Sequence, residues 1–308
     1  MDGQDRALQT DVALHIDVGA ATDAGGREAN EDAVDVMPLA PLPPETEETG
    51  GGLLLALADG MGGYAQGEVA SRLAIETVEQ MFAEEPERDT ALLMKRAFRR
   101  ANDAIYERSA ATGEPGSMGT TLVVAATRGK YATIASVGDS RAYLARANRL
   151  TQITKDHSLV AEEVSRGAMT PTQARQSPRR NVLTQAIGNQ EKLDTKMPSI
   201  FELTLLPEDR LLLCSDGFYD VLTDDDMLST VLADKPGQAA QSLVQLAVER
   251  GTTDNVSAIV AEVLPTRVRP ERELVAAGGA PSYLIPALVA IAAIIFIAIV
   301  VLILMTAR

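Results

Sequence analysis

The chain has 308 residues, of which 46% are hydrophobic, and its acidic residues outnumber its basic ones by 43 to 28, giving a formal net charge of −15. This length allows one large domain or two small ones with a sizeable core. The negative charge argues against binding of nucleic acid, which needs a basic surface. Cys214 is the only cysteine, and His15 and His157 are the only histidines. The chain therefore forms neither an internal disulfide nor a zinc site of three histidines.

The N-terminal part of the chain predicts two strands followed by two helices. Apolar and polar residues alternate over 12–18, as in a half-buried strand, and a short apolar run at 53–58 is typical of a strand buried on both faces. Residues 38–52 are rich in proline, glutamate and glycine, which predicts a solvated loop. Helical spacing of apolar residues covers 67–82 and 89–110.

The middle of the chain changes to short β-rich runs. Residues 121–127, 131–137 and 141–146 are separated by turn residues at 128–130 and 138–140, which predicts a meander with tight turns. The later elements that we expect are strands at 200–206, 210–214 and 256–264 and helices at 225–233 and 237–250. Because strands and helices do not alternate strictly, an α+β sandwich of antiparallel sheets is favoured over a doubly wound fold.

The C-terminal end has a different composition. An uncharged apolar run extends from Leu284 to Met305 and is interrupted only by Pro286 near its start. At about 1.5 Å per residue, this run is long enough to cross a ~30 Å hydrocarbon core. Three arginines precede it, so the positive-inside rule predicts that the large N-terminal part lies in the cytoplasm. We therefore expect a single-pass membrane protein with a domain at 1–265, a juxtamembrane linker at 266–282 and one transmembrane helix at 283–305.

Several aspartates stand beside small residues at the ends of apolar runs. A carboxylate against a hydrophobic core is costly unless its charge is compensated. No lysine or arginine pattern accompanies all of these acids, whereas hard divalent cations such as Mg²⁺ and Mn²⁺ prefer oxygen ligands. The sequence therefore predicts a carboxylate-lined metal site assembled from distant parts of the chain. The acids in question are Asp32, Asp59, Asp139, Asp216 and Asp254.

These acids belong to an ordered set of motifs. Between about residues 12 and 264 the chain contains, in this order, Arg-x-x-x-Glu-Asp, Asp-Gly-x-Gly-Gly, Gly-Thr-Thr, Gly-Asp-Ser-Arg, Asp-His-Ser, Ser-Asp-Gly and Asp-Asn. The set resembles that of the PP2C-type metal-dependent serine/threonine protein phosphatases, in their bacterial form. The resemblance implies an α-β-β-α sandwich of two antiparallel sheets flanked by helices.

The resemblance also implies an activity and its cofactors. The activity is hydrolysis of phosphoserine and phosphothreonine on proteins that a serine/threonine kinase has phosphorylated. The cofactors are two Mn²⁺ or Mg²⁺ ions, with a third in bacterial members, and the nucleophile is a hydroxide that bridges the pair. Two ions about 3.5–4 Å apart acidify a shared water and neutralise the charge of an in-line displacement, which suits a phosphate monoester dianion.

Site residues follow from the same motifs. The resemblance makes Asp59 the carboxylate that bridges the two ions, with the carbonyl of Gly60 as a further ligand. Asp216 and Asp254 match ligands of one ion, on the side opposite Asp59.

The remaining residues of the site have less direct roles in the family. Glu31 and Asp32 match residues that act through metal-bound waters, and Asp139 matches an acid associated with the third ion. Arg27 matches the residue that clamps the substrate phosphate, for which the planar fork of arginine is well suited. The Gly-Thr-Thr motif is interpreted as structural.

One position departs from the pattern of many eukaryotic members of this family. Met61 stands where they have a histidine proposed as the general acid, and methionine cannot donate a proton. Either a metal-bound water protonates the leaving oxygen, which we favour, or His157 approaches the site. Bacterial members commonly have methionine at this position, so the change does not indicate inactivation.

The segment 157–189 leaves two interpretations open. It contains Arg166, Arg175, Arg179 and Arg180 in an otherwise acidic protein. These arginines are either solvated loop charges or, if the segment lies beside the site, contacts for phosphopeptides.

Two other functions compete with a membrane-tethered phosphatase. One is a catalytically inactive, signal-binding member of the same fold, against which the intact set of acids argues. The other is a phosphatase specialised for anti-sigma antagonist proteins, although those relatives usually carry sensor domains that are not visible in this sequence.

Overall fold

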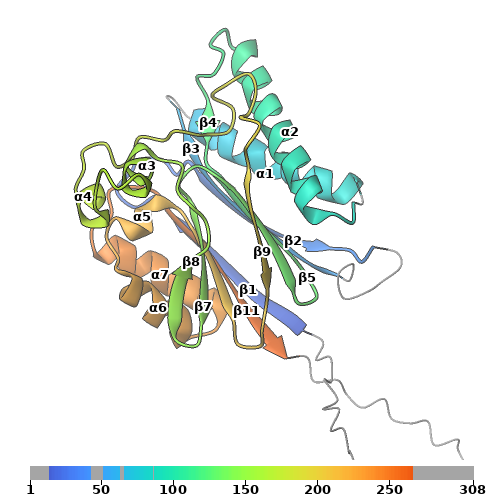
Figure 1. Cartoon of the computed structure of the whole chain (residues 1–308), viewed down its shortest axis with the longest axis vertical. Coiled ribbons are helices and arrows are strands. Elements are labelled where there is room, and N and C mark those ends of the chain that lie inside the picture. Colours follow the sequence, from blue (N-terminus) through green and yellow to red (C-terminus); the bar gives the residue numbers. More distant parts are fainter. Residues whose placement is uncertain (1–13, 43–50, 63–65, 86, 266–308) are drawn as a thin grey trace, which may run out of the picture. The chain divides into compact units, whose positions relative to one another are not determined.

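A computed structural model describes residues 14–42, 51–62, 66–85 and 87–265. In this part the chain forms two antiparallel sheets that pack face to face, with helices on both outer faces (Figure 1). The contacts of the chain divide it into two units at residues 266 and 267, and every described residue belongs to the first. The predicted linker and transmembrane helix lie outside the described residues. Among the helices that are described, none is long and apolar enough to span a bilayer.

The first sheet joins the two ends of the described chain. Its strand order is β1-β11-β10-β7-β8, and all neighbouring strands in it are antiparallel. The bounds are β1 Leu14–Asp23, β11 Val256–Pro265, β10 Arg210–Cys214, β7 Arg141–Arg146 and β8 Arg149–Gln152. Leu14 pairs with Pro265, and Asp23 pairs with Val256. The two strands are therefore paired along their whole length, and the segments next to each end of one strand lie beside the other.

The second sheet has the order β2-β3-β5-β6-β9, and β4 pairs with β3 beside this path. Its strands are β2 Asp32–Leu39, β3 Gly52–Met61, β4 Gly119–Thr120, β5 Leu122–Arg128, β6 Tyr131–Val137 and β9 Ser199–Thr204. In the pairing of β2 with β3, Asp32 lies directly opposite Asp59. The register of this sheet therefore brings two of the predicted site acids side by side.

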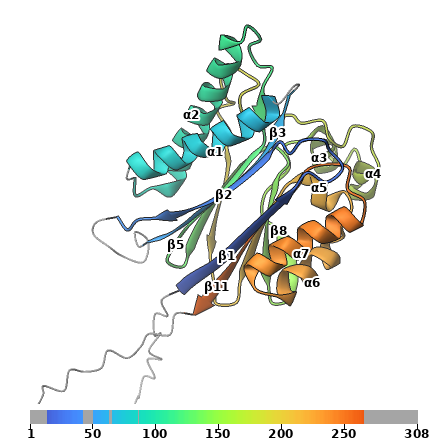
Figure 2. The ribbon, with the colours of Figure 1, turned by 180° about the vertical axis from the view of Figure 1, so that it is seen from behind.

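Helices cover each sheet because each helix has one apolar face. Helices α1 (Gln66–Glu84) and α2 (Thr90–Ala111) pack on the second sheet through a cluster that includes Val78 and Phe98. Helices α6 (Asp224–Ala233) and α7 (Pro236–Glu249) pack on the first sheet (Figure 2). Leu243 of α7 is fully buried in the cluster between them. A third cluster lies between the sheets. The short helices are α3 Leu159–Ser165, α4 Pro171–Arg175 and α5 Asp216–Tyr219.

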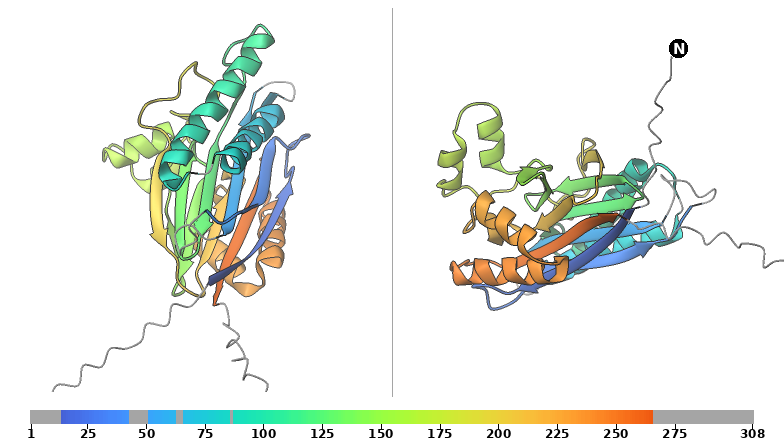
Figure 3. Two further views of the ribbon diagram at one scale, coloured as in Figure 1. Left: turned by 90° about the vertical axis from the view of Figure 1, so that its right-hand side faces the viewer. Right: turned by 90° about the horizontal axis from the view of Figure 1, so that it is seen from below.

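The predicted α+β sandwich of antiparallel sheets with flanking helices is confirmed, and Figure 3 shows its layers edge-on. The predicted meander is wrong. Strands β5 and β6 form a hairpin, but β7 pairs with β10 and β8 in the other sheet. Residues 138–140 cross between the sheets instead of reversing the chain within one sheet. Turn residues and strand propensity do not distinguish these two connections, because both need a sharp change of direction.

Three strands and one short helix were not predicted. They are β2, β4, β8 and α5. Strand β2 ends at Leu39, so the predicted loop at 38–52 begins within a strand. The two-residue strand β4 is too short to show a periodic pattern.

Close backbone packing between β1 and α7 generates a stability prediction. A Cβ atom at Gly19 would lie 2.1 Å from the Cα atom of Gly237, whereas a Cβ at Gly237 meets nothing within 4 Å. Gly19→Ala should therefore lower the free energy of unfolding of residues 1–265 by about 1–3 kcal/mol, because the helix must shift. Gly237→Ala is the matched control and should change it by less than about 0.5 kcal/mol. Urea unfolding measures both, and equal stability of the two variants would contradict the packing.

Candidate metal centre

A cavity of about 640 Å³ lies at the end of the sandwich where the acid-bearing loops and strand ends meet. It is bordered by segments that are far apart in sequence. The predicted site residues that line it are Arg27, Glu31, Asp59, Gly60, Asp139, Asp216 and Asp254. Asp32 does not line the cavity and lies behind it, beside Asp59. The structure therefore brings the predicted residues to one place.

The backbone of Asp59 is held by the Gly-Thr-Thr motif. The N–H of Asp59 donates to Oγ1 of Thr121 at 3.0 Å, and its carbonyl accepts from the N–H of Thr121 at 2.8 Å and from Oγ1 of Thr120 at 2.9 Å. The two threonines are buried. The motif thus fixes the end of β3 against β4 and β5, in line with the structural role predicted for it.

Asp32 is held by hydroxyl groups rather than by a cation from the protein. Oγ of Ser215 donates to Oδ2 of Asp32 at 2.9 Å, and the N–H of Ser257 donates to Oγ of Ser215 at 3.0 Å. Oδ1 of Asp32 and Oδ1 of Asp216 are buried and have no hydrogen-bond partner among the described residues. Unsatisfied buried carboxylate oxygens are costly, so these two atoms indicate that a further ligand belongs here.

Asp216 and Asp254 lie at the same end of two neighbouring antiparallel strands of the first sheet. Asp216 follows β10 and begins α5, while Asp254 lies two residues before β11. Oδ1 of Asp254 accepts from the N–H of Asn255 at 2.9 Å, and Oδ2 accepts from Nη2 of Arg27 at 2.7 Å. Arg27 remains 57% exposed in this ion pair, so it lies at the mouth of the cavity.

Asn255 organises the loop that carries Arg27 and Glu31. Its side-chain amide donates to the carbonyls of Ala24 and Ala29 at 3.0 and 2.8 Å, and its Oδ1 accepts from the N–H of Glu31 at 2.8 Å. The Asp-Asn motif did not predict this role for Asn255. An asparagine directly beside a predicted metal ligand could have indicated this role, because its side-chain amide can both donate to and accept from neighbouring backbone groups.

Asp139 lies on the connection that crosses between the sheets. Gly138 has φ +102, and a Cβ there would come within 2.6 Å of the Thr121 side chain, so only glycine fits this crossing. The hydroxyl of Tyr219 donates to the carbonyl of Asp139 at 3.0 Å. The guanidinium of Arg141 stacks 3.4 Å from the centre of the Tyr219 ring. These contacts fix the position of Asp139 at the cavity.

His157 supports the same crossing. Its Nδ1 accepts from the N–H of Gly138 at 3.1 Å, so Nε2 carries the hydrogen and donates to Oγ of Ser199 at 3.0 Å. Burial lowers the pKa of His157, which favours its neutral form. The side chain is absent from the lining of the cavity, and both ring nitrogens are engaged. The arrangement therefore disfavours His157 as a proton donor.

The acids of the site carry strongly perturbed pKa values. Burial raises the pKa of Asp59 well above its usual range, and the charges of Asp32, Asp216, Asp139 and Asp254 raise it further. Burial likewise raises the pKa of Asp216, of Asp32 to about 6 and of Asp139 to about 7. The acids thus repel one another in a space that solvates them poorly.

Oxygen donors around this cavity fit hard divalent cations. Carboxylates from several segments and the region of Gly60 supply the donor type that Mg²⁺ and Mn²⁺ prefer, and the orphaned oxygens of Asp32 and Asp216 need a positive partner. Within the described residues, no group of three or more histidine, cysteine, aspartate or glutamate side chains is preformed as a metal cluster. The acids surround a shared space rather than converge on one point.

Each of the four arginines of the 157–189 segment has an acidic partner. The salt bridges are Arg166–Glu162, Arg175–Asp224, Arg179–Glu163 and Arg180–Asp220, at 2.8, 3.8, 3.2 and 3.2 Å. All four arginines are absent from the lining of the acidic cavity. This pairing favours the interpretation that they are solvated loop charges.

The perturbed acids predict how the stability of the metal-free domain depends on pH. Because the folded state holds protons on Asp32 and Asp139 that the unfolded chain releases near pH 4, their contribution is complete at low pH and is lost as the pH rises through about 6 and 7. Thermal unfolding of residues 1–265 in chelator should show it. His157 acts in the opposite direction, so Asp139→Asn isolates the effect and should flatten the loss of stability between about pH 4 and 7. An unchanged profile in this variant would contradict the assignment.

Comparisons with known proteins agree with the motifs and the fold. Residues 53–256 match the family described as Protein phosphatase 2C. The serine/threonine protein phosphatase PstP of Mycobacterium tuberculosis is 37% identical over 214 residues, which cover 70% of this chain and 41% of PstP. The serine/threonine phosphatase stp of Listeria welshimeri is 32% identical, over 68% of this chain and 84% of its own length. The chain thus spans less than half the length of PstP.

Solved structures lead to the same family. The catalytic domain of PstP in complex with two manganese ions has a TM-score of 0.69 and 34% identity, over 82% of this chain and 99% of that domain. The phosphatase Stp1 from Staphylococcus aureus has a TM-score of 0.72 and 31% identity, over 85% and 99% of the two chains. The predicted resemblance is confirmed at the level of the family: the chain belongs to the protein phosphatase 2C family.

Proposed function

We propose that this protein is a Mn²⁺- or Mg²⁺-dependent phosphatase that hydrolyses phosphoserine and phosphothreonine on proteins. The observation that carries the proposal is the single cavity lined by Asp59, Asp139, Asp216 and Asp254, with Arg27 at its mouth. A cavity with this charge repels a phosphate dianion unless cations neutralise it. The names of the relatives, which are serine/threonine phosphatases, support the same activity.

The residues of the cavity have separable roles in this proposal. Asp59, Asp216 and Asp254, with the carbonyl of Gly60, would hold the two principal ions, and Asp139 a third. Glu31 and Asp32 would contact the ions indirectly, through bound water molecules. When bound, such ions acidify water and neutralise the negative charge that builds up during phosphoryl transfer.

Arg27 is positioned to recruit the phosphate. Its side chain is exposed, and its partner Asp254 raises its already high pKa, so it stays protonated. A guanidinium can form two parallel hydrogen bonds to phosphate oxygens. Because the salt bridge to Asp254 is partly exposed, exchanging that carboxylate for a phosphate costs little. Binding of cations at Asp254 would favour this exchange.

Protonation of the leaving oxygen is assigned to solvent. Met61 lines the cavity and has no proton to give, and His157 is engaged with Gly138 and Ser199. We therefore retain water as the proton donor.

A hydrolysis assay on residues 1–265 tests the function. Cleavage of p-nitrophenyl phosphate and of a phosphothreonine peptide should require Mn²⁺ or Mg²⁺ and should stop in chelator. Asp59→Asn should lower kcat by more than about 100-fold, since a carboxylate that would hold the ions is lost. Asp35→Asn, on the same sheet but away from the cavity, is the control and should retain activity. Hydrolysis that persists in chelator would rule out the metal-dependent mechanism. Inactive wild type with bound Mn²⁺ would favour the signal-binding alternative.

We also propose that residues 283–305 anchor the protein in a membrane with its catalytic domain in the cytoplasm. The support is the apolar run itself and the arginines before it. The fold is compatible with such an anchor. Strand β11 leads from the cavity at Asp254 to Pro265 over 10 residues, or about 30 Å. Strand β11 therefore ends at the side of the domain opposite the cavity. The corresponding partner is a serine/threonine kinase that phosphorylates the same proteins.

Fractionation tests the anchor. The full chain should sediment with membranes and need detergent for release, whereas residues 1–265 should stay in the soluble fraction. Replacing Ile294 and Ile295 with two arginines should release the full chain, because charges near the centre of a span cost about 2.5–3.5 kcal/mol each. Full-length protein recovered in the soluble fraction without detergent would contradict the proposal.

A further inference from the structure

One wall of the acidic cavity carries no charge. It is formed by the segment 181–189, from which Asn181, Leu183, Ala186 and Asn189 line the cavity beside the acids. The segment follows the helices α3 and α4 along the chain. Its lining residues are two amides and two aliphatic side chains, so it provides hydrogen bonds and apolar contact but no ionic attraction.

Backbone hydrogen bonds hold the first part of this wall, at Val182 and Thr184, in place. The N–H of Leu159 donates to the carbonyl of Val182 at 2.8 Å, and the N–H of Thr184 donates to the carbonyl of His157 at 2.8 Å. Further along, Ile187 and Thr120 exchange two backbone hydrogen bonds at 2.9 and 3.0 Å. The wall is therefore tied to β4, whose neighbour Thr121 holds Asp59.

Asn102 holds the far end of the wall. This residue of α2 is fully buried, its Oδ1 accepts from the N–H of Gly188 at 2.9 Å, and its Nδ2 donates to the carbonyl of Gln190 at 3.1 Å. The two bonds bracket Asn189, whose position at the cavity is thereby set from the helix. A buried amide with both ends used in this way is a positioning device.

The side-chain amides of Asn181 and Asn189 are available to a ligand. Among the hydrogen bonds of the described residues, neither side chain donates or accepts, and both residues are exposed. An asparagine amide offers two donors and an acceptor, which complement the C=O and N–H groups of an extended peptide. These two residues therefore match a main chain, whatever its sequence.

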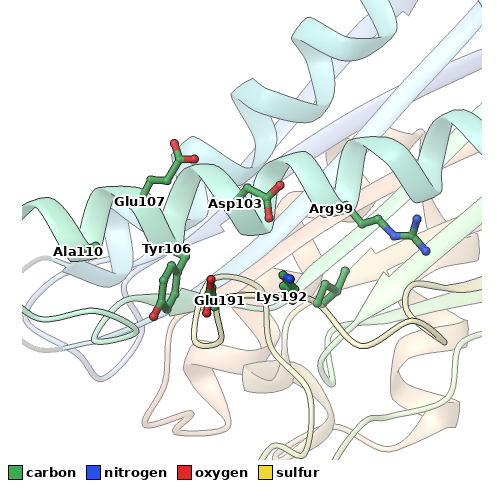
Figure 4. Close-up of a pocket in the computed structure, with 8 residues that line it drawn as sticks. Arg99, Asp103, Tyr106, Glu107, Ala110, Glu191 and Lys192 are labelled. Atoms are coloured by element: carbon green, nitrogen blue, oxygen red, sulfur yellow. The ribbon is translucent and has the colours of Figure 1, made fainter.

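Charged residues near the wall are directed elsewhere. The arginines at 179 and 180 are paired with Glu163 and Asp220. Beyond Asn189, Glu191 and Lys192 line a separate cavity of about 560 Å³ against α2, with Tyr106 (Figure 4). The wall thus presents neutral residues to the acidic cavity, and the charged residues that follow it along the chain line a different one.

We propose that Asn181 and Asn189 bind the main chain of the substrate next to its phosphorylated residue, with Asn102 positioning Asn189. The inference rests on the proposed phosphatase function and adds how peptides are selected. Selection through the main chain and apolar contacts does not use the charge of flanking residues. Acidic residues beside the phosphorylated residue therefore bring no gain in binding.

The test compares peptide and non-peptide substrates of the full chain in detergent with Mn²⁺. Asn181→Ala and Asn189→Ala should each raise KM for a phosphothreonine peptide about 2- to 10-fold, as expected for one lost hydrogen bond. The kcat for the peptide and both constants for p-nitrophenyl phosphate should change by less than about twofold, since that substrate has no main chain. Gln190→Ala, a neighbouring amide outside the cavity lining, is the matched control and should match wild type.

Two further measurements make the proposal falsifiable. Asn102→Asp keeps the acceptor for Gly188 but loses the donor to Gln190, and it should reproduce the selective rise in peptide KM of Asn189→Ala. Peptides with acidic and with neutral flanking residues should have equal KM values within about threefold. Equal effects of Asn181→Ala and Asn189→Ala on both substrates, no effect on either, or a large preference for acidic flanks would overturn the inference. Wild type that fails to cleave p-nitrophenyl phosphate would instead overturn the proposed function, and the inference with it.

Discussion

Mutual repulsion between buried carboxylates is the constraint on which the site depends. Burial raises the pKa of Asp59 most, and the charges of Asp32, Asp216, Asp139 and Asp254 raise it further. A fold stabilises such a group only if rigid strands hold the acids in place and a positive partner neutralises them. Here the strands come from both sheets, so the packing of the sandwich keeps the acids together against their repulsion. That arrangement converts the free energy of core packing into a binding site for cations.

Small polar groups make this arrangement rigid. Thr120 and Thr121 fix the backbone of Asp59, Ser215 holds the carboxylate of Asp32, and Asn255 secures the loop of Arg27 and Glu31. None of these groups adds charge, so they hold the acids without neutralising them. The same principle applies to the cavity wall, where Asn102 supports the segment at 188–190 from within α2. Positioning and charge compensation are thus assigned to different residues.

Much of the fold and of the residues at the cavity could be predicted from the sequence, because the patterns that indicate them are local. The apolar runs predicted most strands and long helices, and the ordered motifs predicted the family and the residues that gather at the cavity. The wrong or missing predictions concern the connection between strands of the two sheets and the residues that support the cavity. The Gly138–Ser140 link was predicted as a hairpin turn, although it joins two sheets, and Asn255 and Asn102 received no role. An asparagine that binds backbone far along the chain leaves no periodic pattern.

The amino-acid sequence by itself indicated which acids gather at this end of the sandwich, because each stands where an apolar run begins or ends beside a small residue. It also specified the sandwich class, since the spacing of apolar residues reflects burial on strands and helices. The three-dimensional packing determined that β7 belongs to the other sheet, that His157 is engaged with Gly138 and Ser199, and that the arginines of 166–180 are paired with acids. These outcomes depend on contacts between residues that are distant along the chain, and no local pattern encodes such contacts.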